Sequence, residues 1–259
     1  MSFKNTVGIV TGGGTGIGRE TCLELAKTGM KIVIGNRNTE KGEEVVEAIK
    51  KNGGDAKFIK TDVSIAEDVK KLVEFTLNEY GEFQYAFNNS GLLGDLEPLG
   101  SQSPESSSYI VDVNIKGVIY CLHYQIAEML KYAGPEKKCS IVNNSSILSA
   151  EAYPGLSVYS ATKHAVTGLT KGAAVELAQS NIRVNAVGPG PINTPMLSDP
   201  TEGNPEVFGG MVPMNRIGTP KEVSDAVLWL FSEESSYITG HTLMIDGGFC
   251  AGPIVSNNG

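Results

Sequence analysis

The sequence predicts an α/β protein: a doubly wound parallel sheet of about seven strands, covered by helices on both faces in a single domain. Two observations lead to this prediction. Short apolar segments alternate with amphipathic helical segments almost to the end of the chain, and most of these segments are apolar throughout. The first one also leads directly into a glycine-rich turn and a helix, as in the first strand–helix unit of a nucleotide-binding sheet.

Seven segments have the length and apolar composition of strands. The first six are continuous or nearly continuous apolar runs, which is typical of strands buried on both faces. These segments are residues 7–10, 31–34, 57–59, 85–87, 140–143, 183–187 and 242–245.

Polar caps mark the ends of the helices between these strands. Ser64 with Glu67 predicts a capping box before a helix that starts at residue 65. Thr219 and Glu222 predict a second box, with a proline at the first helical position between them. Gly29 is expected just after the end of the first helix.

We expect residues 1–251 to form one Rossmann-type domain and residues 252–259 to form a surface tail. Two stretches rich in Ser, Gly or Pro, residues 92–108 and 188–218, are expected to be loops. A loop of about thirty residues is unusual inside a compact domain, so we expect residues 188–218 to act as a substrate lid.

Composition narrows the possible environments and partners. The 259 residues carry a formal net charge of −8, which argues against a nucleic-acid surface and against docking on acidic lipid. No apolar run approaches the roughly 20 residues that span a bilayer, and the first strand starts too early for a signal peptide. The four cysteines are scattered and form no metal-ligand spacing. These features predict a cytoplasmic protein with reduced thiols and no metal.

The glycine-rich turn, residues 11–18, reads Thr-Gly-Gly-Gly-Thr-Gly-Ile-Gly. It matches neither the strict G-x-G-x-x-G pattern, since the third glycine is replaced, nor the nucleotide P-loop, since Arg19-Glu20 follows. The remaining G-x-x-x-G-x-G pattern still places flexible backbone amides at a helix start, where a pyrophosphate binds in a Rossmann-type fold. The predicted contacts are Gly12, Thr15, Gly16, Ile17 and Gly18.

Cofactor choice depends on the end of the second strand. An acidic residue there would bond the ribose 2′-hydroxyl and repel a 2′-phosphate. Asn36 removes that repulsion, and Arg37 offers a bidentate cation to a phosphate. These residues favour NADP, with NAD as the alternative.

Tyr159 and Lys163 stand four residues apart on a predicted helix, so they share one face. The helix follows a strand that ends in hydroxyls, with Ser146 among them, at the edge where open α/β sheets bind ligands. A phenol has a pKa of about 10, and acid–base work near neutrality needs it about 2–3 units lower. One cation supplies about 1–3 units, and an oxidised nicotinamide ring offers a second positive charge.

The chain resembles the short-chain dehydrogenase/reductase family over nearly its whole length. Each matching motif is weak alone, but together and in this order they are very specific. The matching positions are residues 11–18, Asp62-Val63, Asn88-Asn89-Ser90-Gly91, Asn114, Ser146, residues 159–163, Pro189-Gly190 and Asp246-Gly247-Gly248.

The resemblance implies a catalytic tetrad. Tyr159 would be the acid–base residue, and Lys163 would lower its pKa and hold the nicotinamide ribose. Ser146 would bind the substrate oxygen, and Asn114 would position a water that relays protons to Lys163.

The resemblance also implies further cofactor contacts and an assembly. Asp62 and Val63 would flank the adenine, and other positions would lie along the cofactor: Asn89, Gly91, Pro189, Gly190, Ile192 and Thr194. Two departures stand out: Ser90 replaces the usual Ala, and Thr15 stands where many NADP-preferring members have a basic residue. A homotetramer built through two long helices, near residues 109–132 and 159–179, is expected.

Substrate contacts in this family come from segments after the fourth, fifth and sixth strands. Here these offer mostly apolar side chains, which predicts a neutral, largely hydrophobic ketone or secondary alcohol. The candidates are Leu92, Leu93, Glu151, Tyr153, Met196, Leu197, Met211 and Val212.

Three alternatives stay open. The first is a 3-oxoacyl-carrier-protein reductase, although residues 117–130 lack the Lys and Arg that an acidic carrier would bind, and only Lys171 favours it. The second is a cofactor-binding sensor or scaffold without catalysis, although such proteins commonly lack the Tyr or the Lys. The third is a sugar epimerase or dehydratase, which generally carries a larger C-terminal substrate domain.

Overall fold

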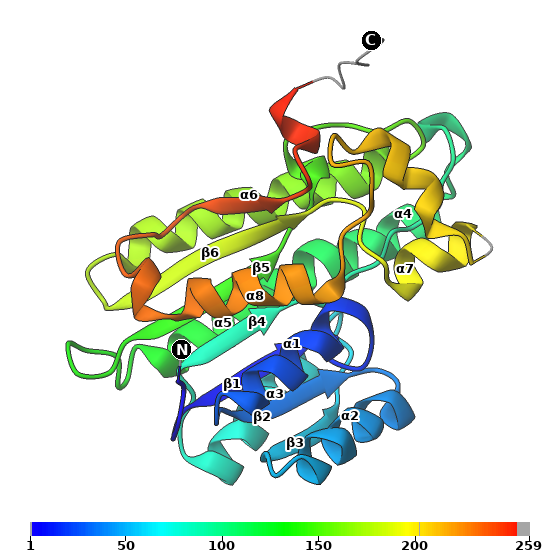
Figure 1. Ribbon diagram of the computed structural model, residues 1–259. Helices are drawn as coiled ribbons and strands as arrows, with labels where there is room; N and C mark the ends of the chain where they lie inside the picture. The colour runs from blue at the N-terminus through cyan, green and yellow to red at the C-terminus, as the bar shows by residue number, and fades with distance from the viewer. Residues whose placement is uncertain (1, 202, 253–259) are drawn as a thin grey trace.

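The computed structural model describes residues 2–201 and 203–252, and it contains the predicted parallel sheet. Seven parallel strands lie side by side in the order β3-β2-β1-β4-β5-β6-β7, and the order reverses between β1 and β4 (Figure 1). All seven predicted strands are confirmed, with ends that differ by a few residues. Their bounds are β1 Val7–Thr11, β2 Lys31–Asn36, β3 Ala56–Lys60, β4 Tyr85–Asn88, β5 Cys139–Asn144, β6 Ile182–Pro189 and β7 Thr242–Ile245.

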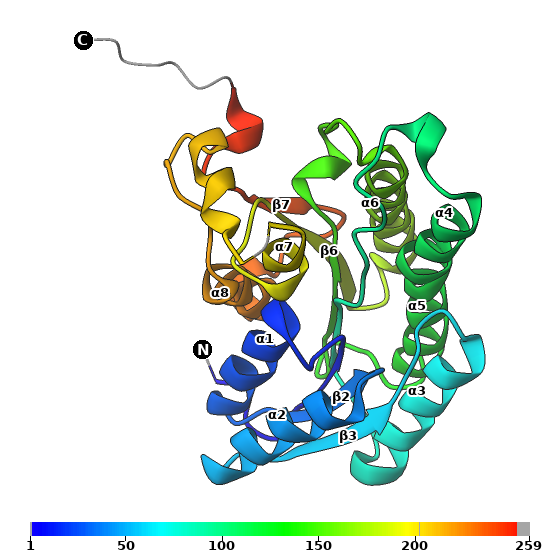
Figure 2. The same cartoon turned by 90° about the vertical axis from the view of Figure 1, so that its right-hand side faces the viewer.

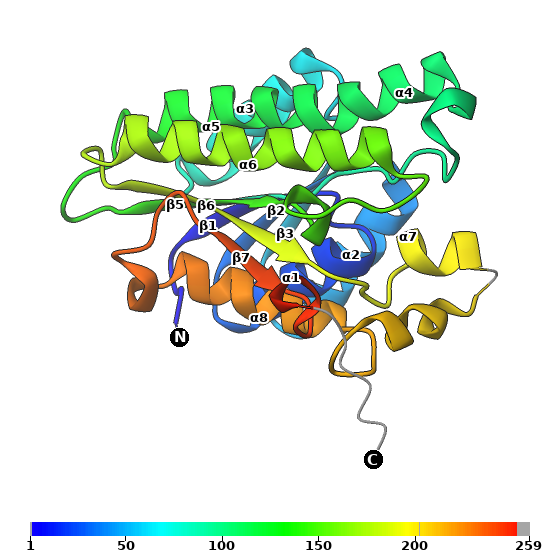
Figure 3. The same cartoon turned by 90° about the horizontal axis from the view of Figure 1, so that it is seen from above.

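Helices cover both faces of the sheet (Figure 2). One face carries α1 (Gly16–Lys27), α2 (Thr39–Lys51) and α8 (Pro220–Phe231). The other carries α3 (Ala66–Tyr80), α5 (Gly117–Met129) and α6 (Ser157–Leu177), and seen from above α5 and α6 run side by side (Figure 3). In the described part of the chain, no helix is both long and apolar enough to cross a membrane.

Two apolar cores hold the helices to the sheet. Strand side chains alternate between the faces, so Val10 and Ile34 pack with the α1–α8 side, while Ile9 and Val33 pack with the α3–α5–α6 side. These side chains are almost completely buried. Burial of each contributes roughly 1.5–3 kcal/mol relative to exposure, which explains why the sequence shows uninterrupted apolar strands.

The helix ends confirm two of the three predicted signals. Helix α8 has the full capping box between Thr219 and Glu222. Gly29 follows α1 with φ of +91°, a conformation that favours glycine. The predicted box at Ser64 is wrong, because α3 begins at residue 66 without a side-chain cap. The Ser64 hydroxyl instead donates to the Asp62 carboxylate at 2.7 Å.

Both predicted loops contain helical structure that the sequence reading missed. Within residues 92–108, a 3-10 turn is followed by α4 (Pro104–Val111), whose cap Ser103 accepts from the amide of Ser106. Helix α4 runs through a π-helical turn, Asp112–Lys116, into α5. Residues 188–218 include the end of β6, α7 (Pro195–Ser198) and two 3-10 segments. The predicted tail lies outside the described residues, apart from Gly252.

A buried amide network joins the sheet to α5 and α6. The Asn88 amide donates to Gln125 and to Asn143, both at 3.0 Å, and Gln125 donates back to Asn88 at 2.8 Å. Asn143 in turn donates to Thr170. Every side-chain amide in this network has a hydrogen-bond partner. The network therefore fixes β4 and β5 against α5 and α6.

Candidate active site

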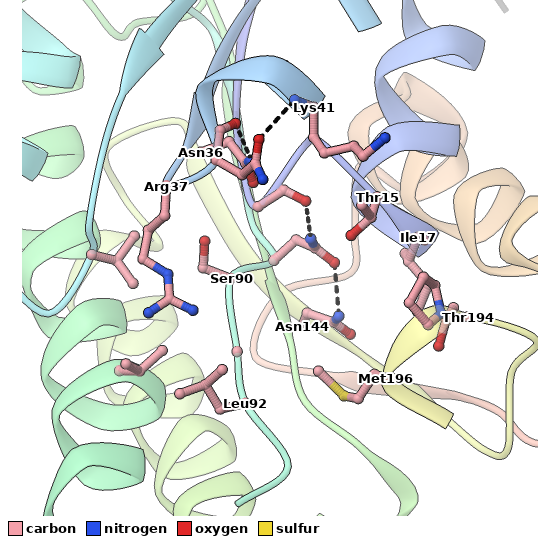
Figure 4. A pocket seen from close by; sticks show the side chains of 18 of the residues that line it. Thr15, Ile17, Asn36, Arg37, Lys41, Ser90, Leu92, Asn144, Thr194 and Met196 are labelled. Atoms are coloured by element: carbon pink, nitrogen blue, oxygen red, sulfur yellow. Dashed lines mark hydrogen bonds between the residues drawn. The ribbon is translucent and has the colours of Figure 1, made fainter. Parts of the chain in front are cut away.

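A cleft of about 360 Å³ opens at the carboxyl edge of the sheet, between the loops that follow β1 and β4 (Figure 4). Ligands bind at this switch point in open α/β sheets, because the loops after the two strands turn to opposite faces. Most of the predicted cofactor residues line the cleft: Gly12, Thr15, Gly16, Ile17, Asn36, Arg37, Asp62, Val63, Asn89, Gly91 and Thr194.

The glycine-rich turn has the backbone that a pyrophosphate site requires. Gly12 and Gly16 adopt φ of +66° and +52°. A Cβ on Gly18 would overlap the Gly12 carbonyl, so glycine there lets α1 start close against the turn. Thr15 precedes α1 without a side-chain cap, which leaves first-turn amides for a ligand. The residues present therefore fit a dinucleotide cofactor.

Asn89 ties the glycine-rich turn to the end of β4. Its amide donates to the carbonyls of Thr11 and Gly12, both at 3.1 Å, and its oxygen accepts from Asn144 at 2.9 Å. The side chain predicted to lie along the cofactor is thus used within the protein. Its role is to fix the cleft wall.

Tyr159 and Lys163 lie one turn apart on α6, both buried. The ammonium of Lys163 is 5.4 Å from the centre of the Tyr159 ring and donates to the carbonyl of Asn144 at 2.8 Å. A methyl group placed on Gly91, in the cleft lining, would lie 3.6 Å from this ammonium and 3.4 Å from the Asn114 oxygen. Lys163 and Asn114 therefore adjoin the cleft at Gly91, whereas Tyr159 is not itself among the residues that line it.

Asn114 is buried in the π-helical turn before α5. Its side chain exchanges two 2.8 Å hydrogen bonds with the backbone of Leu92 and donates to Thr162 at 3.1 Å. Turns of this kind are frequent at functional sites, because one extra residue re-aims the groups around it. Here the turn joins the segment after β4 to α6.

Burial dominates the acid–base properties of the pair. It raises the pKa of Tyr159 to about 12, an increase that the nearby Ser146 hydroxyl partly opposes, and it lowers the pKa of Lys163 to about 8. The expected acidic phenol is therefore not a property of the protein alone. A buried phenolate loses hydration, and the neighbouring ammonium does not outweigh this loss.

Some predicted cofactor residues are not among those that line this cleft: Gly18, Tyr159, Lys163, Pro189, Gly190 and Ile192. Ile192 is buried in the apolar core beside α8. A Cβ on Gly190 would come within 3.0 Å of the Asp246 backbone, so glycine allows close packing there.

The substrate candidates divide into three groups. Leu92 and Met196 line the cleft itself. Leu93 and Tyr153 pack with the apolar group around Tyr159. The others face elsewhere or pack the lid: Glu151 is exposed, Val212 is buried near Gly247, and Leu197 and Met211 are half-buried.

Sequence reasoning missed several residues that line the cleft: Asn38, Lys41, Thr61, Val113 and Asn144. Lys41 had a usable signal, because it lies in the first turn of the helix after Asn36. The others are recognisable only once the chain is folded.

Fold and cleft together place the chain in a class, the oxidoreductases that bind a nicotinamide dinucleotide. A family model described as enoyl-(acyl carrier protein) reductase matches residues 12–250. The chain is 38% identical over 247 residues to the cyclohexanol dehydrogenase of Acinetobacter sp. (strain SE19), covering 95% of this chain and 96% of that protein. It is 39% identical over 246 residues to the 2,5-dichloro-2,5-cyclohexadiene-1,4-diol dehydrogenase of Sphingobium indicum, covering 94% and 96%.

Among solved structures, the 3-ketoacyl-(acyl-carrier-protein) reductase of Brucella melitensis complexed with NADH is similar, with a TM-score of 0.90 at 33% identity, covering 96% of this chain and 99% of that one. The chain belongs to the short-chain dehydrogenase/reductase family. It is an oxidoreductase that interconverts an alcohol and a carbonyl group with a nicotinamide cofactor.

Proposed function

We propose that this protein interconverts a neutral, largely apolar secondary alcohol and its ketone, with Tyr159 carrying the proton and NADP(H) preferred over NAD(H). One observation carries the proposal: the Tyr159 ring packs in an apolar group that includes Leu92, a residue of the cleft lining. The other buried members of that group are Ile110, Ile147, Leu148 and Leu156.

Each member of the tetrad has a task that its surroundings support. The bound nicotinamide supplies or accepts the hydride. Tyr159 gives a proton to the substrate oxygen in reduction and takes one in oxidation, while Ser146 donates a hydrogen bond to that oxygen. Lys163 is held by the Asn144 carbonyl at the end of the cleft, where its charge favours the phenolate. Asn114 keeps the segment after β4 against α6.

The raised pKa of Tyr159 affects the two directions differently. A phenol that stays protonated is a ready proton donor for ketone reduction. Alcohol oxidation needs the phenolate, so the positive charge of the oxidised cofactor must add to that of Lys163. The acid–base residue is thus completed by cofactor binding.

An apolar wall around the phenol favours a ring or chain without charge. Leu92, Leu93 and Tyr153 extend this wall toward the cleft. Two relatives are named for six-membered ring alcohols, cyclohexanol and a cyclohexadienediol, which supports an alicyclic substrate.

NADP preference rests on the end of β2. Asn36 replaces the carboxylate that would repel a 2′-phosphate, and two cations, Arg37 and Lys41, line the cleft. The similar Brucella reductase is described with NADH, so NAD is the competing cofactor.

We also propose that the protein is a cytoplasmic homotetramer. Exposed apolar side chains on or beside α5 and α6, namely Ile119, Leu130 and Val175, support a homotetramer formed through these helices.

In the described residues all four cysteines are free, which supports a reducing, cytoplasmic location. We expect residues 188–218 to close over the substrate, since Thr194 and Met196 already line the cleft.

A 3-oxoacyl-carrier-protein reductase is the second candidate, favoured by the name of the similar Brucella structure. A spectrophotometric panel distinguishes the two, with cyclohexanol, cyclohexanone, an acyclic ketone and a 3-oxoacyl thioester tested with each cofactor. The proposal expects the highest kcat/KM for the ring compounds with NADP(H). A preference for the thioester would replace it with the second candidate, and no turnover of any compound would favour a sensor.

A further inference from the structure

Among the described residues that line the cleft, two are cations, Arg37 and Lys41, and one is an acid, Asp62. From the sequence alone, Arg37 is the expected ligand of a 2′-phosphate. Figure 4 shows the two cations pointing in different directions from the end of β2, Arg37 toward Leu92 and Lys41 toward Thr15. They therefore do not serve the same part of a bound dinucleotide.

Arg37 already contacts helix α4. Its guanidinium donates to the hydroxyl of Tyr109, on α4, and lies 6.0 Å from the centre of that ring. A guanidinium can also stack on an aromatic base. This contact turns the Arg37 side chain toward α4. We expect the side chain to pass the part of the cleft where Asp62 and Val63 would flank the adenine.

Lys41 instead stays beside Asn36. The Asn36 amide donates to the Asn38 carbonyl at 2.8 Å, and the Asn38 side chain accepts from the Lys41 amide at 2.9 Å, so the turn between them is fixed. A Cβ on Gly14 would lie 2.6 Å from the Asn36 nitrogen and 3.1 Å from the Lys41 Cβ. The glycine-rich turn, the end of β2 and Lys41 therefore meet at one place, where the ribose of a dinucleotide is expected.

The Lys41 ammonium can be released for a ligand. Its only ionic partner among the described residues is Glu44, with both oxygens at 3.0 Å, and the two side chains are 44% and 52% exposed. Exposed pairs of this kind contribute little, whereas a phosphate forms stronger, charge-assisted bonds. The first turn of α2 adds a partial positive charge.

We infer that Lys41 is the cation that binds the 2′-phosphate of NADP and so sets cofactor preference, while Tyr109 holds Arg37 over the adenine, where it serves both cofactors. This inference rests on the proposed preference for NADP. It gives to Lys41 the role that the sequence alone would give to Arg37, and it gives Arg37 a different one.

The test is isothermal titration calorimetry of the protein without cofactor, with NADP and with NAD, on five variants. Lys41→Ala should weaken NADP binding about tenfold or more, the loss expected for a charge-assisted bond, and leave NAD within twofold. Lys41→Arg should retain most of the NADP affinity. Lys50→Ala, an exposed lysine in the last turn of the same helix, is the matched control and should change neither.

Arg37→Ala and Tyr109→Phe should weaken both cofactors by similar factors and leave their ratio within threefold. If Arg37→Ala abolishes the preference while Lys41→Ala leaves it intact, the inference is wrong but the proposed NADP preference survives. A Tyr109→Phe variant with an altered ratio overturns the role given to Tyr109. Equal affinities of the unmodified protein for NADP and NAD would overturn both the inference and the preference on which it rests.

Discussion

Lys163 donates a 2.8 Å hydrogen bond to the backbone carbonyl of Asn144, whose side chain is bonded to Asn89 and through it to the glycine-rich turn. The ammonium is therefore anchored to the same wall that shapes the cofactor cleft. Its position depends on β5 and on that wall as much as on α6. Hydrogen bonds at this single strand end therefore link Lys163 to the glycine-rich turn.

Replacing the phenol should separate catalysis from binding. We expect Tyr159→Phe to lower kcat by a factor of about 100–10,000, the usual contribution of a positioned acid–base group. Cofactor affinity should change only a few-fold, because the ring and the neighbouring ammonium remain. Steady-state kinetics and calorimetry check the two quantities, with Tyr237→Phe as control, since Tyr237 is fully exposed. Near-normal turnover of the Tyr159 variant would remove this residue from the mechanism.

Cofactor binding should make the phenol acidic. Burial raises the pKa of Tyr159 to about 12 in the protein alone. The oxidised cofactor adds a positive charge nearby and should lower that pKa, whereas the reduced form should lower it less. The ultraviolet difference spectrum of tyrosinate, recorded against pH for the protein and for Tyr159→Phe, isolates this group. An unchanged titration on addition of oxidised cofactor would contradict the role that we assign to the cofactor charge.

The strands and the α8 cap could be predicted because their causes are local. An uninterrupted apolar run requires two covered faces, and Thr219 reaches Glu222 within one turn. The α3 cap was wrong because a neighbouring carboxylate, Asp62, competes for the Ser64 hydroxyl. Helix α4 was missed, although Ser103 before a proline is itself a start signal.

The site was predictable in outline for a different reason. The geometry of the glycine-rich turn follows from its glycines, which allow positive φ. The four-residue spacing of Tyr159 and Lys163 places both side chains on one face of a helix. The contribution of Asn144 arises only when β5 is brought to the cleft. The pKa of Tyr159 depends on how deeply the fold buries the ring, which spacing along a helix does not reveal.

The buried ammonium should make stability depend on pH. Burial lowers the pKa of Lys163 from 10.5 to about 8. Between these values the unfolded chain holds a proton that the folded protein has released, so the free energy of unfolding should rise with pH in this window. Relative to Lys163→Met, the unmodified protein should gain up to about 1.4 kcal/mol per pH unit between pH 8 and 10. Urea unfolding of both proteins measures this difference, and a difference that does not vary with pH would show that Lys163 titrates normally.

Gly18 should be the least replaceable glycine of the cofactor turn. A methyl group there would overlap the Gly12 carbonyl and approach the Asn89 side chain, so α1 would have to move away from the turn. We expect Gly18→Ala to weaken NADP and NAD alike by at least about tenfold and to lower the free energy of unfolding by about 1–3 kcal/mol, the usual cost of overpacking. Gly100→Ala is the matched control, since a methyl group at Gly100 meets nothing within 4 Å. Calorimetry and urea unfolding measure the two effects. Because the strain lies under the expected pyrophosphate site, both cofactors should lose affinity by the same factor, and a selective loss of one would place the pyrophosphate elsewhere.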